Sequence, residues 1–142
     1  MTFLYFNLDY AIRAHDKVLE ISGGTKGFRD LGLLESILEH VQNDTYYPSF
    51  EDKLTHIVYS IAMNHSFTDG NKRSAIALGS FFMNINGYGK HVGTFILEME
   101  DIVVLLADKK ISKKLLYKIL CDLISDGDLA EEVKIEILDS IE

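Results

Sequence analysis

The sequence predicts an all-α fold, organised as a single domain over residues 1–142. Two observations support this fold class. Pro48 is the only proline in the chain, so little interrupts helix formation, and apolar residues recur at helical spacing in successive segments. Hydrophobic residues make up 47% of the chain and charged residues 25%, which is typical of a globular domain with one core.

Two helices are predicted before Pro48. One face of the first is formed by Leu8, Ile12, His15 and Leu19. Gly23-Gly24 ends this helix, because glycine favours helix termination. Asp30 is a suitable N-cap for the second helix. The apolar stripe of that helix comprises Leu33, Leu34, Ile37, Leu38 and Val41.

Two strongly apolar helices follow Pro48 and flank a short polar segment. The first of them runs into His65, and its apolar positions are Leu54, Ile57, Val58, Ile61 and Ala62. After a turn at Asp69-Gly70, the next helix begins near Asn71 and ends at Asn86-Gly87. Its apolar residues surround it almost completely, so we expect it to be the central buried helix of the domain.

Two or three further helices are predicted, roughly over residues 98–107, 112–125 and 128–139, which gives six to seven in total. Asp128 followed by Glu131 is typical of a capping box at the start of the last one. Residues 122–142 contain eight acidic residues and one lysine, whereas the rest of the chain is nearly neutral. We interpret helices 112–142 as packed on the domain with an acidic solvated face. A docking surface for a basic partner is the alternative.

Composition also excludes several classes of protein. The formal net charge of −8 argues against a general nucleic-acid-binding protein, which would carry a basic face. No apolar run approaches the roughly 18 residues of a membrane span, and the N-terminal segment lacks the features of a signal peptide. Cys121 is the only cysteine, so no intramolecular disulfide is possible. We therefore expect a cytoplasmic protein.

The polar segment between the two central helices, HSFTDGNKR over residues 65–73, has the composition of a phosphate site. The start of a helix presents unpaired backbone N–H groups and a positive dipole end, which favour anions. Gly70 permits a close backbone approach. Lys72 and Arg73 oppose the helix dipole, so they are poor choices for stability unless an anion binds.

Two further residues of this segment suit phosphoryl chemistry. Asp69 could hold a magnesium ion that bridges phosphate oxygens, and His65 could accept a proton from an attacking hydroxyl. Phe67 is expected to point inward and anchor the loop. Taken singly, a histidine, an Asp-Gly turn and an asparagine at helix ends are common structural features, but that reading does not explain Lys72 and Arg73.

The segment resembles the signature motif of the Fic/Doc superfamily, and in particular of its Doc branch, the death-on-curing toxins. The matching positions are His65, Phe67, Asp69, Gly70, Asn71, Lys72 and Arg73. Fic proteins usually have glycine at the position of Lys72, and many relatives have proline at the position of Ser66. The resemblance extends upstream through GGTKGFRDLGLLESIL to His15-Asp16, and covers roughly residues 8–90.

This resemblance implies a Fic-type helical domain that binds ATP with magnesium at the 65–73 loop. For the Doc branch it implies transfer of the γ-phosphate of ATP to a protein hydroxyl, with elongation factor Tu as the expected target and translation inhibition as the result. It also implies a cognate antitoxin. An AMP transferase of the Fic type and a non-catalytic binding module remain alternatives.

Site roles carried over from the family follow the motif. The resemblance implies that His65 is the general base, that Asp69 is the magnesium ligand, and that phosphate is held by Gly70, Asn71, Lys72 and Arg73. Many Fic proteins also carry an inhibitory helix, whose glutamate pairs with a second arginine of the motif. That position is Ile76 here, and the inhibitory pattern is absent from the sequence, so inhibition is expected to come from a separate protein.

Three weaker features keep alternatives open. Arg29 could reach the site or the target, or could pin Asp30. Tyr46-Tyr47 falls where related proteins often have a flap beside the site, but we favour the alternative that the pair covers the core. A metal-dependent phosphohydrolase built on His15-Asp16, His65 and Asp69 is a rival function, disfavoured because no other histidine is spaced to join a metal site.

Overall fold

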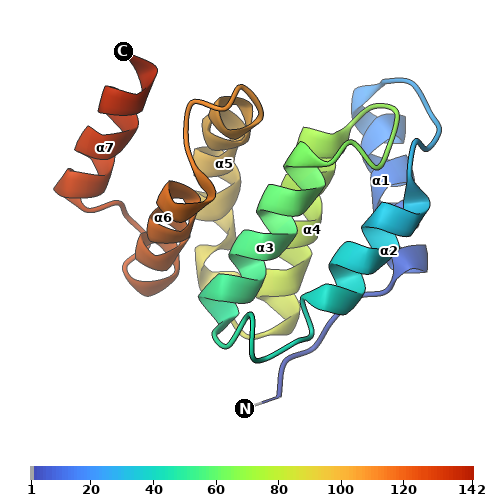
Figure 1. Ribbon diagram of the computed structural model, residues 1–142, viewed down its shortest axis with the longest axis horizontal. Coiled ribbons are helices and arrows are strands. Elements are labelled where there is room, and N and C mark those ends of the chain that lie inside the picture. Colours follow the sequence, from blue (N-terminus) through green and yellow to red (C-terminus); the bar gives the residue numbers. More distant parts are fainter. Residues whose placement is uncertain (1) are drawn as a thin grey trace.

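The computed structural model describes residues 2–142, and this part of the chain is all-α, as predicted. Helices follow one another along the chain, and the central ones lie side by side (Figure 1). Within residues 2–142 the only β-type pairing is an isolated bridge between Phe28 and Phe67. The elements are α1 (Leu8–Ser22), α2 (Leu31–His40), α3 (Phe50–Met63), α4 (Asn71–Ile85), the 3₁₀ turn η1 (Gly89–His91), α5 (Val92–Ala107), α6 (Lys113–Ser125) and α7 (Glu131–Ile141).

Most helix ends agree with the sequence prediction. Gly23 is the C-cap of α1 and Asn86 that of α4, and Gly87 follows with a φ of +89°. The Asp30 side chain accepts a hydrogen bond from the backbone N–H of Leu33, so the predicted N-cap of α2 is confirmed. Local capping chemistry is therefore enough to specify these boundaries.

The apolar pattern does not specify where α3 starts, and two other helix starts differ from the prediction. α3 begins at Phe50, because Ser49 and Asp52 form a capping box ahead of the first predicted apolar residue. α5 begins at Val92 instead of near Glu98, and Phe95 in the added turn is fully buried. The predicted capping box at Asp128 is wrong.

The N-cap of α7 is Ala130, because the Asp128 carboxylate is used elsewhere. Asp128 accepts a hydrogen bond from the backbone N–H of Leu129, the residue that follows it. The Asp122 carboxylate, from α6, accepts the N–H of Ala130 instead. A side chain of the preceding helix therefore takes part in starting α7.

α4 is a central helix, as predicted. It packs against α1, α3 and α5, and Leu78, Phe82 and Met83 on it are fully buried. α3 shares this central position and packs against α2, α4, α5 and α6. One cluster of buried hydrophobic residues extends from Phe6, before α1, to Val133 in α7.

Two loops meet at one end of this core. Residues 64–70 join α3 to α4, and residues 23–30 join α1 to α2, so both emerge at the same end of the molecule (Figure 1). Backbone hydrogen bonds link the two loops, which places the 65–73 motif beside the end of α1. Between residues 2 and 142, no helix has both the length and the apolar character needed to span a bilayer.

Candidate active site

The 64–70 loop and the first turn of α4 enclose a cleft of about 260 Å³. The cleft contains every site residue predicted from the sequence. Its lining consists of Ala62, His65, Thr68, Asp69, Gly70, Asn71, Lys72 and Arg73. Seven of these eight lining residues therefore come from the 65–73 segment.

The backbone of α4 begins at this cleft without a side-chain cap. Gly70 is the N-cap and adopts a left-handed conformation with a φ of +80°, which favours glycine. The first N–H of this turn to bond within the helix is that of Ser74, which donates to the carbonyl of Gly70 over 2.9 Å. The N–H groups of residues 71–73 are consequently the donors that a bound anion could use.

Asn71 organises the loop through its side chain. Its Oδ1 accepts the backbone N–H of Phe67 over 3.1 Å, and its Nδ2 donates to the Phe67 carbonyl over 2.9 Å. Phe67 is fully buried, so the prediction that it anchors the loop is confirmed. The backbone N–H of Asn71 is thus the group that this residue can offer to a phosphate.

Asp69 is held in place by backbone donors from both loops. Thr25 N–H donates to Oδ2 over 3.0 Å, and Gly70 N–H donates to Oδ1 over 2.8 Å. These two bonds, that from Thr25 first, lower the pKa of Asp69, and nearby Arg73 lowers it further. Asp69 is therefore a fixed, ionised carboxylate at the edge of the cleft.

Arg73 connects the start of α4 to the end of α1. Its Nη1 donates to Ser22 Oγ and, over 2.8 Å, to the Gly23 carbonyl, while its Nη2 lies 3.7 Å from Asp69 Oδ1. A guanidinium has five N–H donors, so these contacts leave others for a phosphate in the cleft.

His65 and Lys72 are exposed, as is Thr68 between them. His65 has a φ of +49°, an uncommon conformation for a residue other than glycine, and such strain concentrates at functional sites. The ion pairs found within residues 2–142 do not involve Lys72. An imidazole and an uncommitted ammonium group therefore flank the free end of α4.

The 23–30 loop holds the 64–70 loop from outside. Thr68 N–H donates to the Gly27 carbonyl, and the N–H groups of Arg29 and Asp30 both donate to the Ser66 carbonyl. Gly24, with a φ of +131°, approaches so closely that a Cβ there would lie 2.8 Å from Asp69 Oδ2. Sequence reasoning missed this contact, and the run of glycines in GGTKGF was its only signal.

Two of the weaker sequence features lie away from the cleft. Tyr46-Tyr47 precedes α3, whereas His65 follows it, so the tyrosine pair lies at the opposite end of the helix (Figure 1). The flap interpretation is therefore wrong. Tyr47 instead packs against His56, with ring centroids 4.3 Å apart and the ring planes tilted by 32°. Arg29 reaches the loop through its backbone and does not line the cleft.

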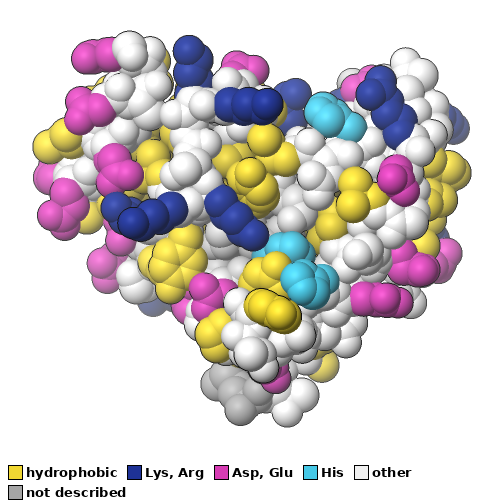
Figure 2. All heavy atoms as spheres, viewed as in Figure 1, with side chains coloured by type: hydrophobic (Ala, Val, Ile, Leu, Met, Phe, Trp, Pro, Cys, Tyr) yellow, Lys and Arg dark blue, Asp and Glu magenta, His cyan; other side chains and the backbone are white. Residues whose placement is uncertain are grey.

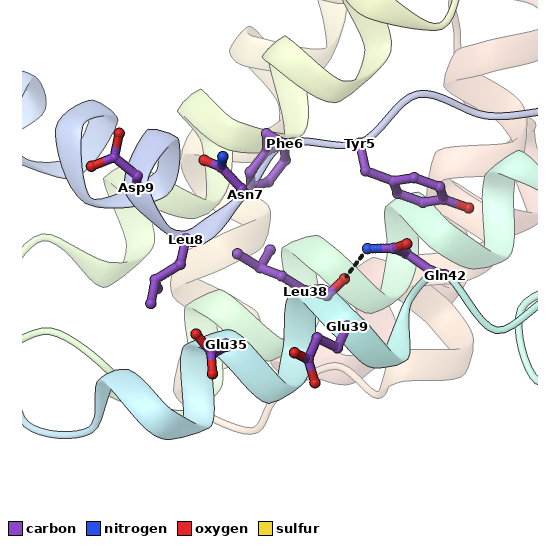
Figure 3. Close-up of a pocket in the computed structure, with 9 residues that line it drawn as sticks. All are labelled: Tyr5, Phe6, Asn7, Leu8, Asp9, Glu35, Leu38, Glu39 and Gln42. Carbon is purple, nitrogen blue, oxygen red and sulfur yellow. Dashed lines mark hydrogen bonds between the residues drawn. The ribbon is translucent and has the colours of Figure 1, made fainter.

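A larger hollow of about 470 Å³ lies between the N-terminal segment and α2 (Figure 3). The acidic residues Asp9, Glu35 and Glu39 surround it, and its base includes Phe6 and Leu38. Three carboxylates repel phosphate groups, so the smaller cleft with Lys72 and Arg73 is the better candidate for binding an anion, despite its size.

The donor set of the cleft fits magnesium in one specific way. Within residues 2–142, no three His, Cys, Asp or Glu side chains converge on a position where they could hold a metal. Magnesium, however, is often held by one or two carboxylates together with substrate phosphates. Asp69, which is ionised and about half exposed, suits that arrangement.

The cleft lies within the part of the chain that is similar to known proteins. The model of the Fic/DOC family matches residues 5–83, which include the cleft. A protein named Toxin Doc from Mycolicibacterium smegmatis is 41% identical over 69 residues, covering 46% of this chain and 53% of the relative. A protein named Protein kinase doc from Escherichia phage P1 is 35% identical over 80 residues, covering 54% of this chain and 63% of the relative. The chain thus spans between half and two thirds of the length of these relatives.

Proposed function

Because the chain belongs to the Fic/DOC family, on its Doc branch, we propose that it is a Doc-like toxin that transfers the γ-phosphate of ATP to a hydroxyl group of a target protein. One observation supports this proposal most directly. The uncapped start of α4, the Asp69 carboxylate, the free Lys72 and the exposed His65 all line one cleft. Phosphoryl transfer needs this combination of anion-binding donors, a metal-compatible carboxylate and a base.

The reaction proceeds through groups of this chain. His65 takes the proton of the target hydroxyl as its oxygen forms a bond to the γ-phosphorus. The bond between that phosphorus and the β–γ bridging oxygen breaks, and ADP leaves. The N–H groups of residues 71–73, with Lys72 and Arg73, stabilise the charge on the phosphate oxygens. A bound magnesium ion would be held by Asp69 and would supply further charge neutralisation at the phosphates.

Lys72 favours γ-phosphate transfer over AMP transfer. Its side chain occupies space next to the start of α4, where the family members with glycine have none. A nucleotide that fits beside this lysine has to present a different phosphate to the target hydroxyl. AMP transfer is the competing function, and it predicts attack at the α-phosphorus.

The proposed target and inhibitor of this kinase rest on the resemblance to the Doc branch. We propose elongation factor Tu as the target, with inhibition of translation as the consequence, and a cognate antitoxin as the inhibitor. Ile76 occupies the position at which many Fic proteins place the arginine that contacts their own inhibitory helix. This substitution supports inhibition by a separate protein.

The test uses purified protein, magnesium, elongation factor Tu, and ATP labelled at either the α- or the γ-phosphate. We expect label to reach elongation factor Tu from the γ position only, and His65→Ala to lower the rate roughly 10²- to 10⁴-fold because the base is lost. Lys90→Ala, which changes an exposed lysine outside the cleft, serves as the control and should retain the wild-type rate. Label from the α position would instead establish AMP transfer, and absence of label from both would exclude this target.

A further inference from the structure

His15 lies beneath the cleft without lining it. It belongs to α1, and its side chain is fully buried. Its ring stacks on Phe67 of the site loop, with centroids 3.7 Å apart and an angle of 4° between the planes. A residue fifty-four positions before Asp69 in the sequence is thus in direct contact with the base of the active-site loop.

The hydrogen bonds of His15 define which of its nitrogens carries a proton. Nε2 lies 2.6 Å from the backbone carbonyl oxygen of Asp69, and a carbonyl oxygen can only accept. Nε2 must therefore be the protonated nitrogen in the neutral ring. Nδ1 lies 3.2 Å from Asp16 Oδ1, a contact that is complete as a hydrogen bond only when the ring is an imidazolium.

The Asp69 carbonyl that His15 holds controls the geometry of the site. It belongs to the same peptide plane as the N–H of Gly70, which donates to Asp69 Oδ1 over 2.8 Å. Fixing the carbonyl therefore fixes this N–H, the Asp69 carboxylate that accepts from it, and the left-handed turn that starts α4. A Cβ on Gly70 would lie 3.5 Å from the His15 ring, so the two are in close contact.

We infer that His15 is a positioning residue, which orients the Asp69–Gly70 peptide, and through it the Asp69 carboxylate and the N–H donors of α4, toward the phosphates of ATP. The inference rests on the function proposed above. A positioning role for His15 differs from a purely structural one in what it requires. It requires an N–H donor at the position of Nε2, whereas a structural role requires only that the volume of the ring be filled.

Three substitutions separate the donor from the volume. His15→Gln can place an amide N–H near the position of Nε2, whereas the shorter side chain of His15→Asn reaches only the position of Nδ1. His15→Phe keeps the ring and its stacking on Phe67 but has no donor. We expect His15→Phe and His15→Asn to lower kcat by roughly 10²-fold, the effect of a small misplacement at an active site, and His15→Gln to restore most of it. KM for the target protein should change little in all three.

Each variant is first checked for cooperative thermal unfolding, and kinetics are compared only among folded variants. The Gln and Asn variants differ mainly in reach, so they keep the comparison informative if the Phe variant does not fold. His56→Gln is the matched control, because His56 is also buried but lies on α3 outside the cleft. Its kcat should match that of the wild type. A wild-type kcat in folded His15→Asn or His15→Phe would overturn the inference.

Nitrogen-15 NMR of the ring tests the hydrogen bond without any assay of activity. We expect a protonated Nε2 in His15, and an unprotonated Nε2 would overturn the inference. If the wild-type protein transfers no phosphate to any substrate tried, the proposed kinase function fails. The positioning role of His15 is then tested by comparing the affinities of the variants for ATP. Weaker ATP binding by His15→Asn than by His15→Gln would support the positioning role, and equal binding by both would contradict it.

Discussion

At the scale of single residues, the environment of each titratable side chain sets its charge. Asp69 accepts two backbone N–H groups, which lower its pKa and keep it anionic, as the proposed role in magnesium binding requires. The environment of His56, in contrast, favours the neutral form of its side chain. Burial, with the positive charge of Lys113 and the nearby His40, lowers the pKa of His56 from its ordinary value of 6.5 to about 4.

The low pKa of His56 predicts a loss of stability in mild acid. The native state keeps His56 neutral, whereas the unfolded chain takes up a proton there as the pH falls below 6.5. The contribution is therefore fully present above that pH and is lost progressively as the pH falls toward about 4. Between about pH 7 and about pH 5 the loss amounts to about 2 kcal/mol.

Substituting His56→Phe removes the titrating group while preserving a ring that can pack against Tyr47. Urea unfolding at about pH 7 and about pH 5 should show a smaller pH dependence in the variant than in the wild type, by about the 2 kcal/mol given above. The acidic residues titrate in both proteins, so they cancel in the difference. Identical pH dependence in the two proteins would show that His56 titrates normally.

At the scale of elements, close approach between helices depends on one small residue in α4. Gly79 lies in the middle of this helix, where an added Cβ would lie 2.8 Å from Phe95 Cζ of α5 and 3.0 Å from Val58 Cγ2 of α3. Both neighbours are buried and cannot move aside freely. The packing of three central helices thus requires a residue that is otherwise unfavourable in a helix.

Gly79→Ala and Gly93→Ala form a matched pair of helical substitutions. We expect Gly79→Ala to destabilise the protein, because overpacking costs about 1–3 kcal/mol and the gain in helix propensity returns at most about 1 kcal/mol. Gly93, in the first turn of α5, is exposed, and a Cβ there meets nothing within 4 Å. Its substitution should be neutral or stabilising by up to about 1 kcal/mol. Chemical denaturation measures both, and a stabilised Gly79→Ala would contradict the close contact.

At the scale of the whole molecule, burial decreases from the central helices toward α7. α3 and α4 carry most of their residues in the core, whereas Val133 is the one residue of α7 described as buried. α7 lies at one side of the molecule next to α6, and acidic side chains gather over that side in the space-filling view (Figures 1 and 2). Its ion pair between Lys118 and Glu136 is partly exposed and stabilises little.

This gradient predicts the order in which the backbone opens. In native-state hydrogen exchange, amides of α7 should exchange through local opening, well before those of α3 and α4, which require global unfolding. Val133→Ala should accelerate exchange in α7 further and leave α4 unchanged, because it removes the main buried anchor of that helix. Equal protection of α7 and α4 would show that the protein opens as one cooperative unit.

The sequence by itself determined the helical class, most helix ends and the position of the site, because these depend on neighbouring residues. Helical spacing of apolar residues, the cap at Asp30 and the glycine after α1 act within a few positions of one another. The 65–73 motif lines one cleft for the same reason, since a tight loop and one helical turn bring its residues together.

The tertiary structure alone decided what holds that cleft in shape. His15 and Thr25 contact Asp69, and Gly23 contacts Arg73, from about fifty positions away in the sequence. Such contacts depend on how α1 packs against α4, and local spacing carries no record of that packing. Tertiary packing also explains why Tyr46-Tyr47 lies away from the site. It likewise explains why Asp122, and not Asp128, accepts the N–H of Ala130 at the start of α7.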